Sequence, residues 1–278
     1  MKNHVLARPV VKWAGGKKKV IKHIMNRLPA SIETFYEPMV GGGFVLFYLA
    51  NLRRFKKAII SDVNPELINA YRVIKKDVES LIQELSKSRY AYNKQTFLEH
   101  RAADTDSLDA KERAARFIYL NKTCFNGLYR VNKDGKFNTP FGTYTNPQIC
   151  DTENLRAVSK CLKNVKILQK DFEEVCTTVT DGDAVYFDPP YIPLSKTSNF
   201  TSYTSGGFGL KEHIRLQNCF SYLADRNARI ILSNSCAPEA LELYQAYDMD
   251  IITGPRNVGG PAEYRKSVSE MLVFAGKR

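Results

Sequence analysis

The stretch ETFYEPMVGGGFVLFYLANL, residues 33–52, places three consecutive glycines between two apolar segments. The first segment is short and aromatic, as in a buried strand, and the second is long enough for a helix. Glycines at such a junction allow a tight turn and let a ligand approach the backbone closely. We predict a strand, a ligand-binding turn at Gly41, Gly42 and Gly43, and a helix, although a turn without a ligand explains the same pattern.

The same order of elements recurs on both sides of this stretch. KKAIISDVNPELINAYRVIK, residues 56–75, reads as strand, turn and helix, and residues 18–28 have the apolar spacing of a helix. Further strands are predicted within residues 165–172, 183–191 and 228–234, with a last strand at SEMLVFAG near the C-terminus. Successive strand–turn–helix units are typical of an α/β fold with a parallel sheet.

The middle of the chain has a different pattern. Residues 76–121 carry charged helical segments, and residues 124–144 carry the turn pairs NG and DG between short β-prone runs. We therefore expect a discontinuous sheet domain of residues 1–75 and 146–278. Residues 76–145 would be an inserted, mostly helical domain with a hairpin-like segment at 124–144.

Length and composition exclude several classes of protein. The 278 residues lie near the upper limit for one hydrophobic core, which favours two domains or one domain with an insertion. There is no apolar run of about 18 residues and no signal-peptide pattern at the N-terminus, so we expect a cytoplasmic protein without membrane contact. The six cysteines are scattered without a CxxC pair, which predicts reduced thiols and no metal site.

The charge points to a polyanionic partner. Lys and Arg number 41 against 29 Asp and Glu, which gives a formal net charge of +12. A large positive charge favours association with nucleic acid. A basic surface without any such partner remains the alternative at this point.

A second informative stretch is VYFDPPYIPLS, residues 185–195. Prolines cannot donate to a sheet ladder, so a strand ends there and Asp188 and Tyr191 are held on a stiff turn. If Asp188 and the Pro189 carbonyl accept hydrogen bonds from an aromatic amine, its lone pair is freed to attack an electrophile, and Tyr191 offers a ring for stacking. A proline-terminated strand with a capping aspartate is the structural alternative.

Two weaker patterns indicate ligand contacts, the first of them to an adenosine. Asp62 follows the second strand, where a carboxylate can accept hydrogen bonds from both ribose hydroxyls. KWAGGKKK, residues 12–19, contains the single tryptophan and could be a second loop with its backbone close to a ligand, or a solvated basic start to a helix. The dinucleotide pattern GxGxxG is absent, which argues against a nicotinamide-dependent oxidoreductase.

Taken together, these segments resemble the Dam-type DNA adenine-N6 methyltransferases, the GATC-modifying enzymes with the tetrapeptide DPPY. The resemblance is carried, in the family's order, by KWAGGK, FYEPMVGGGF, SDVNPELI, FNGLYRVNKDGKFNTPFGTY and YFDPPYIPLSKTSNFTSYT. It covers most of the chain. It implies a Rossmann-like sheet, an inserted target-recognition domain, the cofactor S-adenosylmethionine with S-adenosylhomocysteine as its product, and flipping of the target adenine out of duplex DNA.

The resemblance also implies roles for individual residues. Asp188, Pro189, Pro190 and Tyr191 would be catalytic. The cofactor would be bound by residues of four motifs, with Asp62 at the ribose and the QKDF pair at the adenine: Trp13, Ala14, Lys17, Glu37, Pro38, Gly41, Gly42, Gly43, Asp62, Asp171, Phe172 and Asp188.

On the DNA side, the resemblance implies contacts from Lys12, Phe125, Asn126, Leu128, Arg130 and Pro140. Arginine can bind guanine O6 and N7 together, and apolar atoms can meet the thymine methyl group. Two positions depart from the family's pattern: Phe125 stands where tyrosine is frequent, and Thr143 stands where many relatives have arginine. Specificity or salt dependence can therefore differ from those of the relatives.

Functions other than duplex-DNA adenine methylation fit parts of the same pattern. A DNA-binding protein without catalysis is disfavoured by the intact DPPY, whereas an enzyme acting on cytosine N4 or on RNA uses the same amine chemistry. The segment with Arg130 favours DNA. We expect a monomer in solution, in a bacterial cytoplasm at the nucleoid or, if phage-encoded, in the host cytoplasm.

Overall fold

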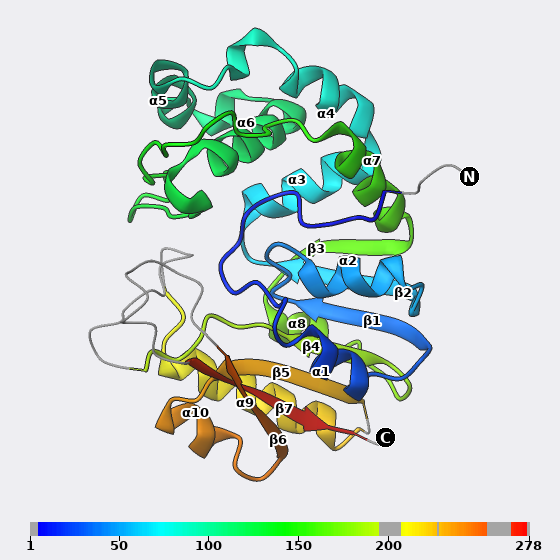
Figure 1. Ribbon diagram of the computed structural model, residues 1–278. Coiled ribbons are helices and arrows are strands. Elements are labelled where there is room, and N and C mark those ends of the chain that lie inside the picture. The colour runs from blue at the N-terminus through cyan, green and yellow to red at the C-terminus, as the bar shows by residue number, and fades with distance from the viewer. Residues whose placement is uncertain (1–4, 195–206, 227, 255–267, 277–278) are drawn as a thin grey trace.

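The protein is built around a seven-stranded sheet (Figure 1). The computed structural model describes residues 5–194, 207–226, 228–254 and 268–276; part of the expected DPPY segment, residues 195–204, lies outside them. The strand order is β3-β2-β1-β4-β5-β7-β6. The strands are β1 (Ile32–Pro38), β2 (Phe55–Asp62), β3 (Val165–Gln169), β4 (Ala184–Phe187), β5 (Arg229–Ser235), β6 (Asp248–Gly254) and β7 (Val268–Ala275).

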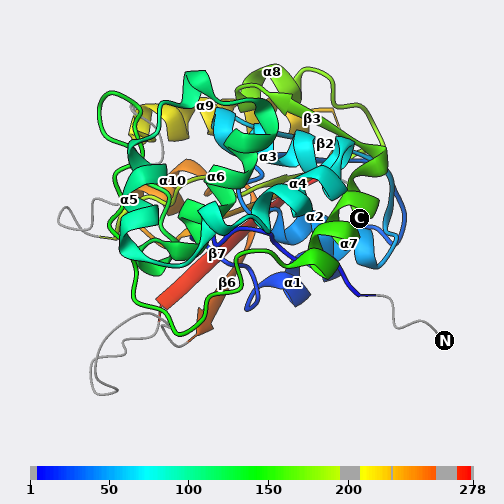
Figure 2. The same ribbon diagram turned by 90° about the horizontal axis from the view of Figure 1, so that it is seen from above.

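Helices cover both faces of the sheet. The view from above shows α1 and α2 on one side and α8 and α9 on the other (Figure 2). The helices are α1 (Ile21–Arg27), α2 (Phe44–Asn51), α3 (Pro65–Lys76), α4 (Val78–Leu85), α5 (Lys94–Ala102), α6 (Ala110–Thr123), α7 (Thr152–Cys161), α8 (Phe172–Cys176), α9 (Leu210–Ala224) and α10 (Pro238–Leu243). The short 3₁₀ turns are η1 (Ser88–Tyr90), η2 (Thr105–Ser107), η3 (Phe125–Gly127) and η4 (Leu162–Asn164).

The strands alternate their apolar side chains between two cores. Phe35 and Tyr186 pack with α1, α2 and α3, whereas the neighbouring Tyr36 and Val185 pack with α8, α9 and α10. Successive side chains of a strand point to opposite faces, so a strand covered on both sides reads as a continuous apolar run. This confirms the predicted α/β fold.

The carboxyl-terminal part of the sheet differs from the prediction. β6 was not predicted, and β7 runs antiparallel to β5 and β6 rather than parallel. A parallel neighbour needs a crossover of a dozen or more residues, usually a helix. Residues 255–267 contain Pro255, Gly259, Gly260 and Pro261 and no apolar helical pattern, so the sequence between β6 and β7 does not favour a crossover helix.

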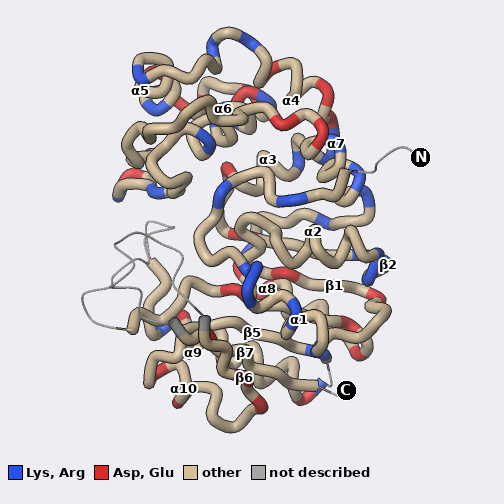
Figure 3. Tube along the Cα trace, viewed as in Figure 1, with Lys and Arg blue, Asp and Glu red and all other residues tan. Residues whose placement is uncertain are grey.

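The helical part between α3 and α7 stands above the sheet in Figure 1. Phe117 and Ile118 of α6 belong to the same apolar core as Leu67 and Ile74 of α3. The division into residues 1–75 with 146–278 and residues 76–145 stays a prediction, because buried side chains are continuous across that boundary. Figure 3 shows Lys and Arg on the segment before α1, on α5 and on the 124–144 segment, so the positive charge is spread over several elements.

Residues 124–144 form a looped ribbon. Two isolated antiparallel bridges, Cys124 with Phe141 and Val131 with Phe137, join its sides without a continuous strand. The expected turn glycines adopt positive φ, at 65° for Gly127 and 75° for Gly135. No helix in the described part of the chain has the length and apolar character needed to span a membrane.

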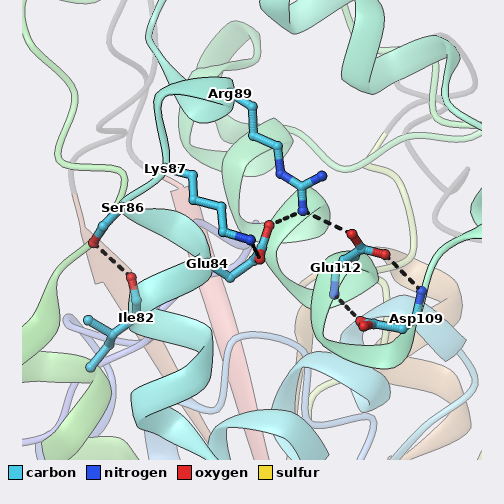
Figure 4. A network of polar contacts seen from close by, with 7 residues as sticks. All are labelled: Ile82, Glu84, Ser86, Lys87, Arg89, Asp109 and Glu112. Atoms are coloured by element: carbon cyan, nitrogen blue, oxygen red, sulfur yellow. Dashed lines mark hydrogen bonds and ion pairs between the residues drawn. The ribbon is translucent and has the colours of Figure 1, made fainter.

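A network of charged side chains holds the inserted helices together (Figure 4). Glu84 at the end of α4 is buried and paired with Lys87 at 2.6 Å and with Arg89, which also reaches Glu112 at 3.0 Å. Burial opposes the charge on Glu84, yet the hydrogen bonds from Lys87 and Arg89 lower its pKa. Asp109 and Glu112 form a capping box at the start of α6. Local caps and one buried carboxylate therefore fix α4 against α6.

We expect Asp109→Ala to lower the free energy of unfolding by about 1 kcal/mol, because an N-cap acceptor for the Glu112 amide is lost. Chemical denaturation measures the change. Asp225→Ala is the matched control: Asp225 is exposed at the C-terminal end of α9, where a carboxylate opposes the helix dipole, so its loss should not destabilise. Equal effects of the two substitutions would contradict the capping role.

Candidate active site

The carboxyl ends of β1, β2 and β4 meet at one cavity of about 750 Å³. Ligand pockets commonly measure roughly 300–1,000 Å³. The cavity brings together residues predicted from separate motifs: Trp13, Ala14, Lys17, Glu37, Gly41, Gly42, Gly43, Asp62, Asp171, Phe172, Asp188, Pro189, Pro190 and Tyr191. Of the residues predicted to bind the cofactor, Pro38 alone does not line it.

The glycine turn after β1 is bonded to the end of β2. The amides of Met39 and Val40 donate to the Ser61 carbonyl at 2.8 and 2.9 Å, and the Gly41 amide donates to Asp62 Oδ2 at 3.1 Å. Gly41 has a φ of 48°, which favours glycine. A Cβ there would lie 2.6 Å from the Trp13 ring. The turn therefore keeps its backbone open to the cavity only with glycine.

Asp62 forms hydrogen bonds both with the glycine turn and with the start of α3. Its Oδ1 accepts a hydrogen bond from the Asn64 amide at 2.9 Å, while Asn64 caps α3 in front of Pro65. Burial raises the pKa of Asp62, and the backbone donors of Asn64 and Gly41 oppose this rise. The carboxylate is thus a structural clamp at the cavity wall as well as the predicted ribose acceptor.

Glu37 is a buried carboxylate beneath the same turn. It accepts a hydrogen bond from the Leu46 amide at 2.9 Å, in the first turn of α2. Burial raises the pKa of Glu37 well above its ordinary value, and the Asp188 carboxylate raises it further. An acceptor at a helix N-terminus satisfies an otherwise unpaired amide, so Glu37 fixes where α2 begins.

The DPPY turn lies in a cluster of charged groups. Lys17 is 1% exposed, and its Nζ lies 2.7 Å from Asp188 Oδ1 and 3.7 Å from Glu270 Oε1. The Tyr191 hydroxyl donates to Glu270. Burial raises the pKa of Asp188, and Lys17 opposes this. Burial, together with Asp188 and Glu270, also raises the pKa of Tyr191 well above its ordinary value, so Tyr191 remains a protonated donor.

The QKDF pair lies on the other side of the cavity. Asp171 caps α8 through the Glu173 amide at 3.1 Å and pairs with Arg215 of α9 at 2.8 Å. The Arg215 guanidinium carbon lies 5.0 Å from the centre of the Phe172 ring. Arg215 therefore fixes both residues that were predicted to recognise the cofactor's adenine.

The predicted DNA contacts lie outside the cavity, on the 124–144 ribbon and the adjoining loop. Phe125, Asn126, Arg130, Pro140 and Lys12 are exposed, and Leu128 is half-buried. The Phe125 amide donates to the Pro140 carbonyl at 2.8 Å, which brings two predicted contacts together. Asn138 accepts a hydrogen bond from Arg130 Nε at 2.8 Å and so orients the guanidinium.

One loop joins this ribbon to the cavity. Trp13, which lines the cavity, stacks on Tyr129 of the ribbon with ring centres 5.8 Å apart. Buried Asn121 accepts a hydrogen bond from the Lys12 amide at 2.7 Å and donates to the Lys12 and Gly127 carbonyls. Residues 12–13 thus join the ribbon to the cavity, which Trp13 lines.

The sequence interpretation missed Glu270, Arg215 and Asn121. An acidic residue inside the apolar strand SEMLVFA was a readable signal for Glu270. Arg215 and Asn121 lie on helices where a polar residue is ordinary, so no local signal marked them.

Comparison with known proteins identifies this arrangement. The model of the D12 class N6 adenine-specific DNA methyltransferase family matches residues 13–256, which is more than half of the chain. The chain belongs to this family.

Curated relatives agree over nearly the full length. A type II methyltransferase of Lactococcus lactis subsp. cremoris is 42% identical over 98% of this chain and 96% of its own, and one of Methanocaldococcus jannaschii is 44% identical over 96% and 98%. The DNA adenine methylase of Escherichia coli is 31% identical over 96% and 95%. A solved precorrin 8w decarboxylase of Methanobacterium thermoautotrophicum, 15% identical, covers 99% of this chain and 98% of its own with a TM-score of 0.41.

This D12-class enzyme is therefore an S-adenosylmethionine-dependent adenine-N6 DNA methyltransferase. Its cavity suits that cofactor. Gly41 and Gly42 provide a cradle that a Cβ would fill, because the added atom would approach Trp13 to 2.6 and 3.0 Å. Asp62 places a carboxylate at the wall, and Phe172 places a ring there.

We expect Gly41→Ala to weaken S-adenosylmethionine binding about tenfold, because the left-handed backbone costs about 1–2 kcal/mol and Trp13 must leave the cavity wall. Calorimetric titration measures the affinity. Gly16→Ala is the folding control, since a Cβ there meets nothing within 4 Å and should leave thermal stability unchanged. Wild-type affinity in Gly41→Ala would remove the turn from cofactor binding.

Proposed function

We propose that this enzyme methylates N6 of adenine in GATC sequences of duplex DNA, after flipping the adenine into a pocket at Asp188–Tyr191. One observation carries the proposal: the DPPY turn and the glycine turn border the same cavity, and the ribbon with Arg130 adjoins it through residues 12–13. The Escherichia coli relative is named a DNA adenine methylase, and the two more similar relatives are named type II methyltransferases.

The chemistry follows from the residues of the DPPY turn. When bound, S-adenosylmethionine supplies an electrophilic methyl group. Asp188 and the Pro189 carbonyl accept hydrogen bonds from the adenine amine, which draws its nitrogen toward tetrahedral geometry and directs the lone pair at the cavity. Tyr191 stacks on the base, a contact worth about 1–3 kcal/mol. Flipping is required because a base inside a duplex cannot reach such a pocket.

Recognition is assigned to the ribbon and to Lys12. Arg130 is exposed and oriented by Asn138, as a side chain that binds a guanine edge at two points must be. Phe125 is 51% exposed on the ribbon, which leaves a large apolar side chain available to insert into the base stack. Asn126, Leu128 and Pro140 surround it on the ribbon.

The proposed catalytic acceptor is tested by Asp188→Ala. We expect methyl transfer to fall about 10²–10³-fold, because a preorganised acceptor is lost, while cofactor affinity stays within a few-fold. The rate of Asp188→Asn should lie between those of the wild type and Asp188→Ala, since asparagine keeps a neutral acceptor oxygen. Single-turnover assays with labelled cofactor separate these rates, and near-normal turnover in Asp188→Ala would refute the assignment.

The pH dependence tests the contact between Lys17 and Asp188. Asp188 accepts hydrogen bonds best when ionised, and burial raises its pKa, so the rate should fall as the pH drops through that raised pKa. Lys17 opposes the rise, so Lys17→Met should move this acid limb to higher pH. The rate is followed at saturating cofactor, with the exposed neighbour substitution Lys18→Met as control. An unmoved acid limb would mean that Lys17 does not act on Asp188.

Base reading is tested by Arg130→Ala. We expect a loss of about 1–3 kcal/mol of discrimination at one outer base pair of GATC, because a bidentate guanine contact disappears. A phosphate contact would instead weaken methylation of every duplex equally and flatten the salt dependence. GATC and singly altered duplexes are compared at two salt concentrations, and exposed Lys133→Ala serves as a ribbon control.

The site preference itself is measured by methylome sequencing of plasmid DNA from a Dam-deficient host expressing this chain. Methylation confined to adenine in GATC is the expected result. A preference of the wild-type enzyme for another sequence would refute the GATC proposal and leave adenine methylation intact.

A further inference from the structure

We propose that Glu270 of β7 is a positioning residue for methyl transfer, which acts by holding the Tyr191 ring and the Lys17 ammonium beside Asp188. The inference rests on the proposed role of the DPPY turn and extends it to a strand that none of the predicted motifs includes.

The sheet topology explains how a distant strand reaches the DPPY turn. β7 lies next to β5, which in turn lies next to β4, the strand that leads into Asp188. Glu270 is paired in register with Ser235, the last residue of β5, and Ser235 lines the cavity. Because β7 runs antiparallel, an early residue of that strand lies at the edge where β4 and β5 end. The reversed direction of β7 therefore brings Glu270 to the site.

One carboxylate oxygen serves two partners. Glu270 Oε1 accepts the hydrogen bond from the Tyr191 hydroxyl and lies 3.7 Å from Lys17 Nζ. Lys17 Nζ also lies 2.7 Å from Asp188 Oδ1 and 5.0 Å from the centre of the Tyr191 ring. The hydroxyl end of the ring is bonded to β7, and the Tyr191 backbone directly follows the two prolines after β4. The hydrogen bond therefore fixes the direction of the ring axis before a base arrives.

The second carboxylate adds to the pairing of Lys17, whose Nζ also donates to the Gly15 carbonyl. Lys17 is 1% exposed, whereas the Asp188 and Glu270 side chains are 24% and 22% exposed. A buried ammonium is stable only when well paired. Because the Lys17 ammonium interacts with both carboxylates, Asp188 can still accept hydrogen bonds from the amine of the target adenine. Glu37 and Tyr186 also face Asp188 from β1 and β4, and Cys236 faces Glu270.

A purely structural ion pair would produce a different set of effects. Loss of such a pair lowers stability and perturbs every function of the cavity, including cofactor binding. A positioning residue instead changes the rate constant at saturating cofactor and the stacking of the target base. Misplacement of a reacting group by about 1 Å can cost about a hundredfold in rate.

Three substitutions separate these roles. Glu270→Gln keeps an oxygen acceptor for the Tyr191 hydroxyl without the charge, Glu270→Ala removes both, and Tyr191→Phe removes the donor alone. Glu242→Gln, on an exposed position of α10, is the control. Each protein is assayed by single-turnover methylation, by calorimetric titration with S-adenosylmethionine, and by fluorescence of a duplex with 2-aminopurine at the target position.

We expect Glu270→Ala to slow methyl transfer about tenfold to a hundredfold, with cofactor affinity within about threefold of wild type. The flipped 2-aminopurine should emit more brightly, because a loosened ring quenches it less. Glu270→Gln should recover most of the rate. Glu270→Ala combined with Tyr191→Phe should be no slower than the slower single variant, since both act through one hydrogen bond.

Independent, additive losses in the double variant would overturn the inference, and so would a loss confined to cofactor affinity or thermal stability. Equal damage from Glu270→Gln and Glu270→Ala would overturn the route through the Tyr191 hydroxyl. The duplex is the one that the wild-type enzyme methylates, so failure of the GATC proposal leaves the test intact. Failure of the DPPY proposal is seen separately, in the activity of Asp188→Ala.

Discussion

Two carboxylates, buried Glu37 and half-buried Asp62, hold the edge of the sheet on which the rest of the site is built. Each accepts hydrogen bonds from backbone amides of a turn or helix that follows a strand. Glu37 accepts one from Leu46, and Asp62 accepts one each from Gly41 and Asn64. Burying a carboxylate is costly unless it is hydrogen-bonded, so these residues stabilise one backbone arrangement and penalise others. The glycine turn lies between them and has little freedom to rearrange.

From that edge, the loop before α1 connects the cavity to the 124–144 ribbon, to which we assign DNA recognition as a proposal. Trp13 packs over the glycine turn and stacks on Tyr129, while Lys12 is bonded through Asn121 to the start of the ribbon. A displacement of the ribbon must therefore move a wall of the cavity. Packed rings and a buried amide thus give a physical basis for coupling between the ribbon and the cavity.

The opposite wall depends on a buried cation. Lys17 belongs to the same loop, and its ammonium connects the DPPY turn with β7. The loop before α1 thus contacts three segments: the ribbon through residues 12–13, the glycine turn through Trp13, and the DPPY turn through Lys17. Because Lys17 is buried, water screens its pairing with Asp188 only weakly, and the contact is correspondingly strong.

Local features of the sequence were sufficient for the elements and for most of the cavity's lining. Three glycines after a strand, Asn64 before Pro65, and two prolines after β4 each impose a backbone conformation on their own neighbours, so their positions at strand ends were predictable. The direction of β7, the existence of β6, and the partners of Glu270, Arg215 and Asn121 were not predictable from local features. Each of these depends on residues far apart in the chain: Lys17 meets Glu270 across 253 positions only because β7 is inserted antiparallel beside β5. Side-chain type and spacing report on neighbours along the chain, whereas a shared hydrogen bond between distant strands exists only once the sheet order has brought them together.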